Sequence, residues 1–332
     1  MVNPVPYRLD SIRLAAWLCA LLVAGCKGPQ SVLDPAGRDA EVLAGLFWVL
    51  LSGAVVLWLA VNGLMLYIAR LNPRPHSRRL AEALIIGGGI VMPTLLLSGL
   101  LIFALREMPR QREAGSGLTV RVTGESWWWR VEYLRDGAPV ASANELRLPT
   151  GSRSELVLEA SEYIHSFWIP AFGGKTDMIP GRTTRMSLEP IATGEYRGQC
   201  AEFCGESHAR MALIGVAMEP QDFAAWLEAQ ADPAAEPSSP EAGRGHDIFL
   251  REGCGGCHTI RGTPAQGQAG PDLTHLGGRR SLAAASLPME RSALIDWLRD
   301  PAKIKPGARM PAYSHLPEAD LADLATYLEG LE

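Results

Sequence analysis

A set of sulfur and nitrogen ligands around position 200 is the part of this 332-residue chain with the clearest chemical potential. Cys200, Cys204, His208 and Met211 lie in one short stretch, and His165 lies 35 residues before Cys200. Thiolate, imidazole and thioether groups are ligands that copper prefers, and a single-copper electron-transfer site needs only one cysteine, two histidines and a methionine. The second cysteine therefore allows two thiolates to bridge two copper ions. Because such a pair changes its bond lengths little when it gains one electron, the set predicts electron transfer rather than substrate chemistry.

Two other interpretations of these residues remain open. Cys200 and Cys204 could form a disulfide in an oxidising compartment. They could also lie with His208 on one face of a helix that holds zinc. Neither interpretation uses Met211 or the upstream histidine, and Gly205 favours a loop between strands over a helix. We therefore favour copper.

A second pattern near the C-terminus indicates a covalently attached haem. Cys254, Cys257 and His258 form the Cys-x-x-Cys-His signature of c-type haem, in which two thiols bind the porphyrin and the histidine binds the iron. Alone, the pattern could also be a redox dithiol or half of a zinc site. Met310 is expected on a loop, where a second axial ligand would raise the haem potential. Met289 is the competing ligand, in a stretch that reads as helical.

The elements that must carry these sites begin with two uncharged runs, 42–69 and 83–105, in a hairpin over 42–105. Both exceed the ~20 residues that cross a bilayer core. The short connection holds four arginines, Arg70, Arg74, Arg78 and Arg79. Because positive loops tend to stay in the cytoplasm, everything after Arg106 is predicted to lie outside.

The N-terminus reads as a targeting segment. Arg8 and Arg13 precede an apolar run that is too short to span a bilayer and that ends in Val-Ala-Gly-Cys. This ending resembles a bacterial lipobox and predicts a signal peptide over 1–25 with a lipid on Cys26. Cys26 could instead be a buried thiol of a third membrane helix.

The outer part divides in two. Residues 117–220 alternate apolar and polar side chains in short runs separated by glycine and proline, which predicts a β-sandwich or barrel. A proline-, alanine- and serine-rich segment, 230–243, is expected to be a semi-flexible linker. It precedes a domain over 244–332, with helices expected over 242–252, 291–300 and 318–331. Three further histidines, His246, His275 and His315, are predicted to be solvated.

The stretch around position 200 resembles the CuA motif of subunit II of haem-copper cytochrome c oxidases, Cys-x-Glu-x-Cys-x-x-x-His-x-x-Met, and segment 164–168 resembles the context of the upstream histidine. The resemblance implies that Cys200 and Cys204 bridge two coppers. It also implies a ligand role for four other residues: His165 and His208 would bind one copper each, and Met211 and the backbone carbonyl of Glu202 would bind weakly. A magnesium ion shared with subunit I is implied on the Glu202 side chain.

Other segments extend the resemblance. In the family's aromatic cluster the first tryptophan lies where electrons arrive, a role that passes to Trp127, whereas Trp128 and Trp129 are expected to be structural. Segments 270–273 and 309–313 resemble the haem-lining and methionine loops of class I cytochromes c, which makes Met310 the implied partner of the attachment motif. Glu82 lies near the place of a glutamate of a proton path in the family, but the glycines that follow it depart from the usual pattern.

The fold implied is multidomain: a two-helix transmembrane hairpin, an all-β cupredoxin-like Greek-key barrel and an all-α class I cytochrome c domain. The function implied is that of subunit II of a caa-type oxidase. Electrons would pass from a donor, such as a cytochrome c or a quinol-cytochrome c reductase, through haem c and CuA to subunit I. There oxygen is reduced to water and protons are pumped.

The implied location is the bacterial inner membrane, with subunit III as a further partner and the copper and haem domains on the periplasmic or extracellular side. Two alternatives remain: the CuA electron-accepting subunit of a nitric oxide reductase, and a membrane-tethered electron carrier without its own enzyme complex. The net charge of −5 gives no indication of a nucleic-acid partner.

Overall fold

The computed structural model describes residues 25, 27–71, 73, 75, 77–110, 113–115 and 117–332. The predicted signal peptide up to Ala24 and the predicted lipidation site Cys26 lie outside the described residues. Two compact units are present: one contains the membrane hairpin, and the other contains the β-sheet region together with the C-terminal helical region.

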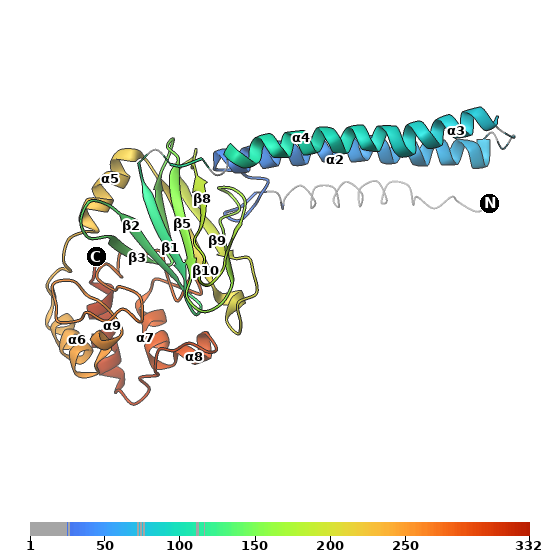
Figure 1. Cartoon of the computed structure of the whole chain (residues 1–332). Helices are drawn as coiled ribbons and strands as arrows, with labels where there is room; N and C mark the ends of the chain where they lie inside the picture. Colours follow the sequence, from blue (N-terminus) through green and yellow to red (C-terminus); the bar gives the residue numbers. More distant parts are fainter. Residues whose placement is uncertain are drawn as a thin grey trace, which may run out of the picture. The chain divides into compact units, whose positions relative to one another are not determined.

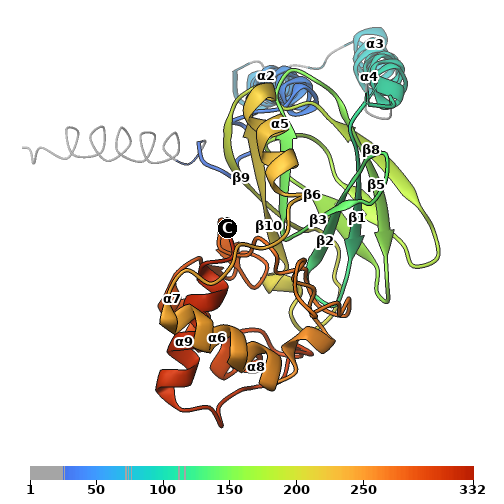
Figure 2. The same cartoon turned by 90° about the vertical axis from the view of Figure 1, so that its left-hand side faces the viewer.

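The hairpin unit consists of two long apolar helical segments, Arg38–Leu71 and Arg78–Arg110. The first is α2 (Arg38–Leu66) continued by a π-helical turn, η1 (Tyr67–Leu71). The second runs through α3 (Arg78–Ile86), a π-helical turn η2 (Gly87–Val91) and α4 (Met92–Arg110). Figure 1 shows both segments as long helices, and Figure 2, which views them end-on, shows them apart from each other. At 34 and 33 residues, each is longer than a bilayer core requires.

The sandwich domain is made of two five-stranded sheets. The first has the order β3-β2-β1-β5-β8, with β1 (Thr119–Gly124), β2 (Trp129–Leu134), β3 (Val140–Ala143), β5 (Ser154–Ala160) and β8 (Thr184–Leu188). The second has the order β4-β10-β9-β6-β7, with β4 (Glu145–Pro149), β6 (His165–Trp168), β7 (Thr176–Met178), β9 (Gly194–Cys200) and β10 (Ala212–Met218). Because β1 pairs with β5 and β4 with β10 in parallel, the chain must cross between strands that are distant in sequence.

Large aromatic and aliphatic side chains fill the space between the sheets. Trp129, Tyr133 and Phe167 are fully buried there, as the alternation of the strands predicts. Helix α5 (Pro220–Ala229) follows β10 and packs Trp226 edge-on against Tyr133, with ring centroids 5.2 Å apart. The core therefore holds rigidly the strands from which the ligand residues project.

The C-terminal domain (residues 240–332) is helical, with α6 (Pro240–Arg251), η4 (Cys254–Gly256), α7 (Arg291–Arg299), α8 (Pro301–Ile304) and α9 (Glu318–Glu329). A short hairpin, β11 (Ser281–Leu282) and β12 (Leu287–Pro288), interrupts it. Figure 2 shows α6 crossing close to α9. A Cβ at Gly245 would lie 2.1 Å from the Asp323 carbonyl oxygen, so only glycine permits this approach.

The three-part architecture predicted from the sequence is confirmed, with local differences. Helix α6 begins at Pro240, inside the segment expected to be linker, because the Ser239 hydroxyl accepts a hydrogen bond from the Ala242 amide. The prediction that Met289 is helical was wrong: it lies between β12 and α7. The prediction that His275 is solvated was also wrong, since His275 is buried and contacts the Asp232 carbonyl oxygen at 3.1 Å.

Candidate metal centre

The ligand residues meet because β6 and β9 are neighbours in the second sheet. Phe167 of β6 pairs with Cys200 at the end of β9, which places His165 beside the loop that follows Cys200. That loop holds Cys204, turns through the 3-10 helix η3 (His208–Arg210) and ends at β10. Its Gly205 has φ +113, a conformation that a side chain disfavours. A loop rather than an α-helix therefore carries the ligands.

The predicted side-chain ligands form one chain of close contacts. Nδ1 of His165 lies 3.7 Å from Sγ of Cys200, which lies 3.7 Å from Sγ of Cys204. The latter sulfur lies 3.6 Å from Nδ1 of His208 and 3.9 Å from Sδ of Met211. Both cysteines are free thiols, since a disulfide would bring their sulfurs to ~2.05 Å.

Glu202 contributes two different groups to this region. Its carbonyl oxygen lies 3.1 Å from Sγ of Cys200, within the ligand cluster. Its side chain is exposed, and its carboxylate accepts a hydrogen bond from the Phe203 amide at 3.2 Å. The Phe203 ring beside it is 74% exposed. The carbonyl thus faces the sulfurs while the carboxylate remains available to a group outside the chain.

The electrostatics of the cluster favour a cation. The hydrogen bond with Cys204 lowers the pKa of Cys200, and contact with His165 adds to this, whereas the pKa of Cys204 is raised because it retains the shared proton. A metal ion that replaces this proton would stabilise both thiolates. His165 and the two cysteines are buried, and their ligand atoms lie within 4.8 Å of one another. Two thiolates, two imidazoles and a thioether in this arrangement fit soft or borderline metals such as copper.

Trp127 contacts the ligand loop directly. Its indole Nε1 donates a hydrogen bond to the Cys204 carbonyl oxygen at 2.8 Å, and its ring stacks on Tyr163. The backbone of Trp127 has φ 147, a strained conformation for a residue with a side chain. Trp129 is fully buried and packs edge-on against Phe167. Of the three tryptophans, Trp127 is thus the one held against a ligand backbone.

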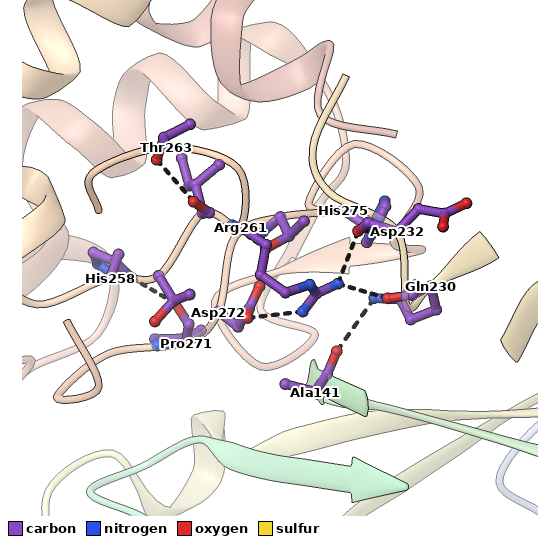
Figure 3. Close-up of polar contacts among 12 residues, drawn as sticks. Ala141, Gln230, Asp232, His258, Arg261, Thr263, Pro271, Asp272 and His275 are labelled. Carbon is purple, nitrogen blue, oxygen red and sulfur yellow. Dashed lines mark hydrogen bonds and ion pairs between the residues drawn. The ribbon is translucent and has the colours of Figure 1, made fainter. Parts of the chain in front are cut away.

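The attachment motif in the C-terminal domain has its own prearranged histidine. His258 donates from Nδ1 to the Pro271 carbonyl oxygen at 2.7 Å, which leaves Nε2 with a free lone pair (Figure 3). Burial lowers the pKa of His258 more than this hydrogen bond raises it, which favours the neutral imidazole that iron requires. A Cβ at Gly270 would lie 2.5 Å from the His258 ring. The residues present therefore fit a c-type haem.

The remaining members of this site are placed as follows. Cys254 is buried with its sulfur 3.8 Å from the Tyr313 hydroxyl, and Cys257 is exposed. Met310 lies on a loop after α8 and packs against the core of the C-terminal domain. Tyr313 was not singled out as a functional residue from the sequence, although it lies in the segment that resembles the methionine loop.

The methionine loop meets the metal loop. The Ser207 hydroxyl donates to the Pro306 carbonyl oxygen at 2.7 Å. A Cβ at Gly307 would lie 2.8 Å from the Trp127 ring, so the backbone of this loop passes directly over the indole. With Tyr163 and the backbone at Gly307 against its ring, Trp127 is only 8% exposed.

Comparisons with known proteins match the two domains that carry these candidate sites. Residues 138–218 match the family described as cytochrome C oxidase subunit II, periplasmic domain, and residues 242–332 match the cytochrome c family. The chain is 30% identical over 328 residues to cytochrome c oxidase subunit 2 of Alkalihalophilus pseudofirmus, covering 94% of each chain. It is 32% identical over 255 residues to that of Bacillus sp. (strain PS3), covering 73% of this chain and 70% of the relative. The solved periplasmic domain of subunit II of cytochrome oxidase of Bradyrhizobium japonicum is 31% identical, covers 34% of this chain and 92% of that chain, and has a TM-score of 0.33.

Proposed function

Because this chain belongs to the cytochrome c oxidase subunit II family and carries a cytochrome c domain, we propose that it conducts electrons from an external donor, through haem c and CuA, to the catalytic subunit. The chain is a component of a haem-copper oxidoreductase. Neither helical segment of the hairpin contains a histidine in its sequence, so oxygen chemistry is assigned to subunit I. Oxygen reduction with proton pumping is the function proposed for the assembled complex.

The observation that carries this proposal is the unbroken row of ligand atoms from His165 through the two sulfurs to His208. We assign Cys200 and Cys204 as bridging ligands, with His165 and His208 at the two ends. Met211 and the Glu202 carbonyl are assigned as weak ligands, and the Glu202 carboxylate as a magnesium ligand shared with subunit I. When bound, the copper pair supplies one-electron transfer with little change in geometry.

The protein around the sulfurs has two tasks in this proposal. The sheet holds the loop so that the ligands are preorganised, because β6 and β9 fix His165 and Cys200 through paired backbones. Burial excludes water from His165, Cys200 and Cys204. Both features would keep the ligands in nearly the same positions in the oxidised and reduced states of the site.

The C-terminal domain is assigned as the holder of haem c. Cys254 and Cys257 would bind the porphyrin covalently, and His258 and Met310 would bind the iron. The Pro271 carbonyl oxygen keeps the His258 ring in the orientation and tautomer that axial ligation needs. A histidine and methionine pair raises the potential of the haem when it is bound.

The remaining assignments concern the membrane. We propose that the chain lies in the bacterial inner membrane, with both redox domains outside the cytoplasm and subunits I and III as partners. Cys26 is proposed to carry a lipid after removal of residues 1–25. Mass analysis of the mature N-terminus tests this assignment: a Cys26→Ser chain should lose the mass of the diacylglycerol.

Metal and haem analysis of the purified chain tests the central proposal. We expect two coppers and one covalent haem per chain, and an electron spin resonance spectrum in which one unpaired spin is shared by two coppers. Cys200→Ser should abolish the shared-spin spectrum, while Ser161→Ala, at a residue outside the ligand set, should retain it. A wild-type chain that binds one copper, or that contains a Cys200–Cys204 disulfide under the same conditions, would contradict the assignment.

A second measurement separates the proposed complex from the alternatives. The purified complex should consume oxygen with a reduced donor, whereas a nitric oxide reductase would consume nitric oxide. A chain that purifies from the membrane without a large multi-helix partner would instead favour an independent electron carrier.

A further inference from the structure

The hairpin of the C-terminal domain contains an unusual turn. Between β11 and β12, Ala283, Ala284 and Ala285 have φ values of 50, 58 and 54. The left-handed region is unfavourable for residues with a Cβ, and residues other than glycine rarely occupy it in succession. Such a backbone persists only where its surroundings over-determine it. The contacts of this turn should therefore explain why it is held.

Each carbonyl oxygen of the turn accepts a hydrogen bond. That of Ala284 accepts from the Ala212 amide at 3.1 Å, and that of Ala285 accepts from Arg197 Nη1 at 3.1 Å. The carbonyl oxygen of Ala283 accepts from Lys305 Nζ, also at 3.1 Å. The left-handed turn presents the three carbonyls to these three donors. Two of them point at the sandwich domain.

The position of these contacts is what gives them importance. Ala212 directly follows the predicted ligand Met211 and is the first residue of β10. Its amide donates to the turn of the C-terminal domain. The hydroxyl of Ser286, next to the turn, donates to the carbonyl oxygen of Arg210, which directly precedes Met211. The backbone on both sides of Met211 is therefore bound by the C-terminal domain.

A second set of contacts flanks the turn. Arg147 is mostly buried, forms an ion pair with Glu145 at 2.6 Å and donates to the Gly278 carbonyl oxygen at 3.0 Å. The other oxygen of Glu145 accepts from the Arg280 amide at 2.8 Å. Because a buried ion pair needs further hydrogen bonds to offset its desolvation, the C-terminal domain completes a polar group that the sandwich domain cannot complete alone.

The segment between the domains is also tied down. Arg261 donates to the carbonyl oxygens of Gln230 and Asp232 and pairs with Asp272, while Gln230 donates to the Ala141 carbonyl oxygen (Figure 3). His275 meets the same Asp232 carbonyl. The start of the linker thus follows the surface of the C-terminal domain.

We propose that the left-handed turn Ala283–Ala285 is a docking element that binds the C-terminal domain in one fixed position on the metal loop. The C-terminal domain is then a stationary donor to the metal loop rather than a tethered domain that swings. It also occupies the face over Trp127, so an external electron carrier must deliver to the C-terminal domain. The electron route in this inference depends on the proposed function, but the docking does not.

Hydrogen exchange of the Ala212 amide in the full chain tests the docking without any cofactor. We expect this amide to be protected in the wild type. Ala285→Val, which disfavours the left-handed conformation, should raise its exchange rate at least tenfold, whereas Ala285→Gly should leave it unchanged or lower it. Arg197→Gln removes the partner without altering the turn and should also raise it. Matched changes at the exposed helical Ala319, to Val and to Gly, should leave it unchanged.

The outcomes separate the docking from the electron route. Equal Ala212 exchange in the wild type, Ala285→Val and Arg197→Gln chains would overturn the docking inference. Global unfolding must be measured on the same chains, because a change in Ala212 exchange that only follows overall stability would overturn it as well. With cofactors bound, photoreduction of the haem should be followed by copper reduction at a rate that does not depend on solvent viscosity. Protection of Ala212 without any haem-to-copper transfer would reject the proposed function and leave the docking intact.

Discussion

Trp127 and Cys204 are joined by a hydrogen bond of 2.8 Å from the indole Nε1 to the Cys204 carbonyl oxygen, although 77 residues separate them. The contact places an aromatic ring against the backbone of a ligand residue, beneath the loop that leads to Met310. The backbone of Trp127 has a strained φ. The surrounding contacts hold the ring in place, because it stacks on Tyr163 and is covered by the backbone at Gly307. Trp127 is thus a side chain that contacts both the metal loop and the loop that leads to Met310.

Trp127→Phe tests the role of this contact. The variant keeps an aromatic ring but loses a buried hydrogen bond, which should lower the free energy of unfolding by about 0.5–1.5 kcal/mol. We expect copper content to be retained and the rate of copper reduction after photoreduction of the haem to fall. Trp128→Phe is the control, because Trp128 is half-buried beneath Arg130 rather than against a ligand. Equal rates in the two variants would refute a role for Trp127 in the transfer.

Met211→Leu tests the assignment of a weak ligand. Leucine is similar in size but cannot bind copper, and the bridging sulfurs and both imidazoles remain. We expect two coppers per chain, as in the wild type, with an altered copper reduction potential and electron spin resonance spectrum. The measurements are metal content and a redox titration. A spectrum and potential identical to those of the wild type would show that Met211 only fills space.

Gly270→Ala tests the packing around His258. A Cβ at this position would meet the imidazole ring at 2.5 Å, so the ring must move or the loop must open. We expect less covalent haem per chain, or haem whose absorption spectrum shows displaced axial ligation. Gly256→Ala is the matched control within the attachment motif, because nothing lies within 4 Å of a Cβ there. Normal haem content and spectrum in Gly270→Ala would contradict the proposed role of His258.

Asn144 offers a test of the sandwich itself. It adopts φ 60 between β3 and β4, and its Oδ1 accepts a hydrogen bond from the Trp129 amide at 2.9 Å. Asn144→Ala loses this hydrogen bond. It also leaves alanine in the left-handed region, where no side-chain hydrogen bond offsets the backbone strain. We expect a loss of about 1–3 kcal/mol in the free energy of unfolding, measured by denaturant titration. Asn144→Gly should lose less than Asn144→Ala, because glycine accepts this φ, and the opposite order would be inconsistent with backbone strain.

The docked position should depend on pH and salt. Glu162 of the sandwich domain pairs with Arg309, and this hydrogen bond, with a second from Ser126, lowers the pKa of Glu162. A carboxyl group with a lowered pKa in the folded state stabilises that state above its unfolded pKa of about 4.3, and the contribution is lost as pH falls through the lowered value. We therefore expect Ala212 protection, corrected for intrinsic exchange, to fall below about pH 4.

Salt and a variant provide the controls for that dependence. The pair is exposed, so ~1 M salt should weaken it. Arg309→Gln should reduce the salt effect on Ala212 exchange, with the remainder due to the second exposed pair between the domains, Arg280–Glu195, whereas Arg299→Gln, which breaks the Arg299–Glu318 pair within the C-terminal domain, should preserve it. If the salt dependence of Ala212 exchange were unchanged in the Arg309→Gln chain, the Arg309–Glu162 pair would not be its cause.

Features that depend on local sequence could be predicted. The two long apolar helices follow from uninterrupted apolar composition, because length and polarity can be read directly from the sequence. The attachment motif is a fixed spacing of two cysteines and a histidine. For Met289, local pattern failed: an apolar residue before α7 reads as helical, but Glu290 and Pro288 end the hairpin before the helix begins.

The amino-acid sequence by itself determined which ligands are available, where the two long apolar helices lie and that an attachment motif follows the β-strand region. The family resemblance predicted that His165 and Cys200 share a site, but tertiary structure decided how they meet, because strand pairing between β6 and β9 joins residues distant in the chain. It also decided the left-handed turn at Ala283–Ala285. Alanine carries no local preference for that backbone, so contacts distant in the sequence, the hydrogen bonds from Lys305, Ala212 and Arg197, must help to hold it there.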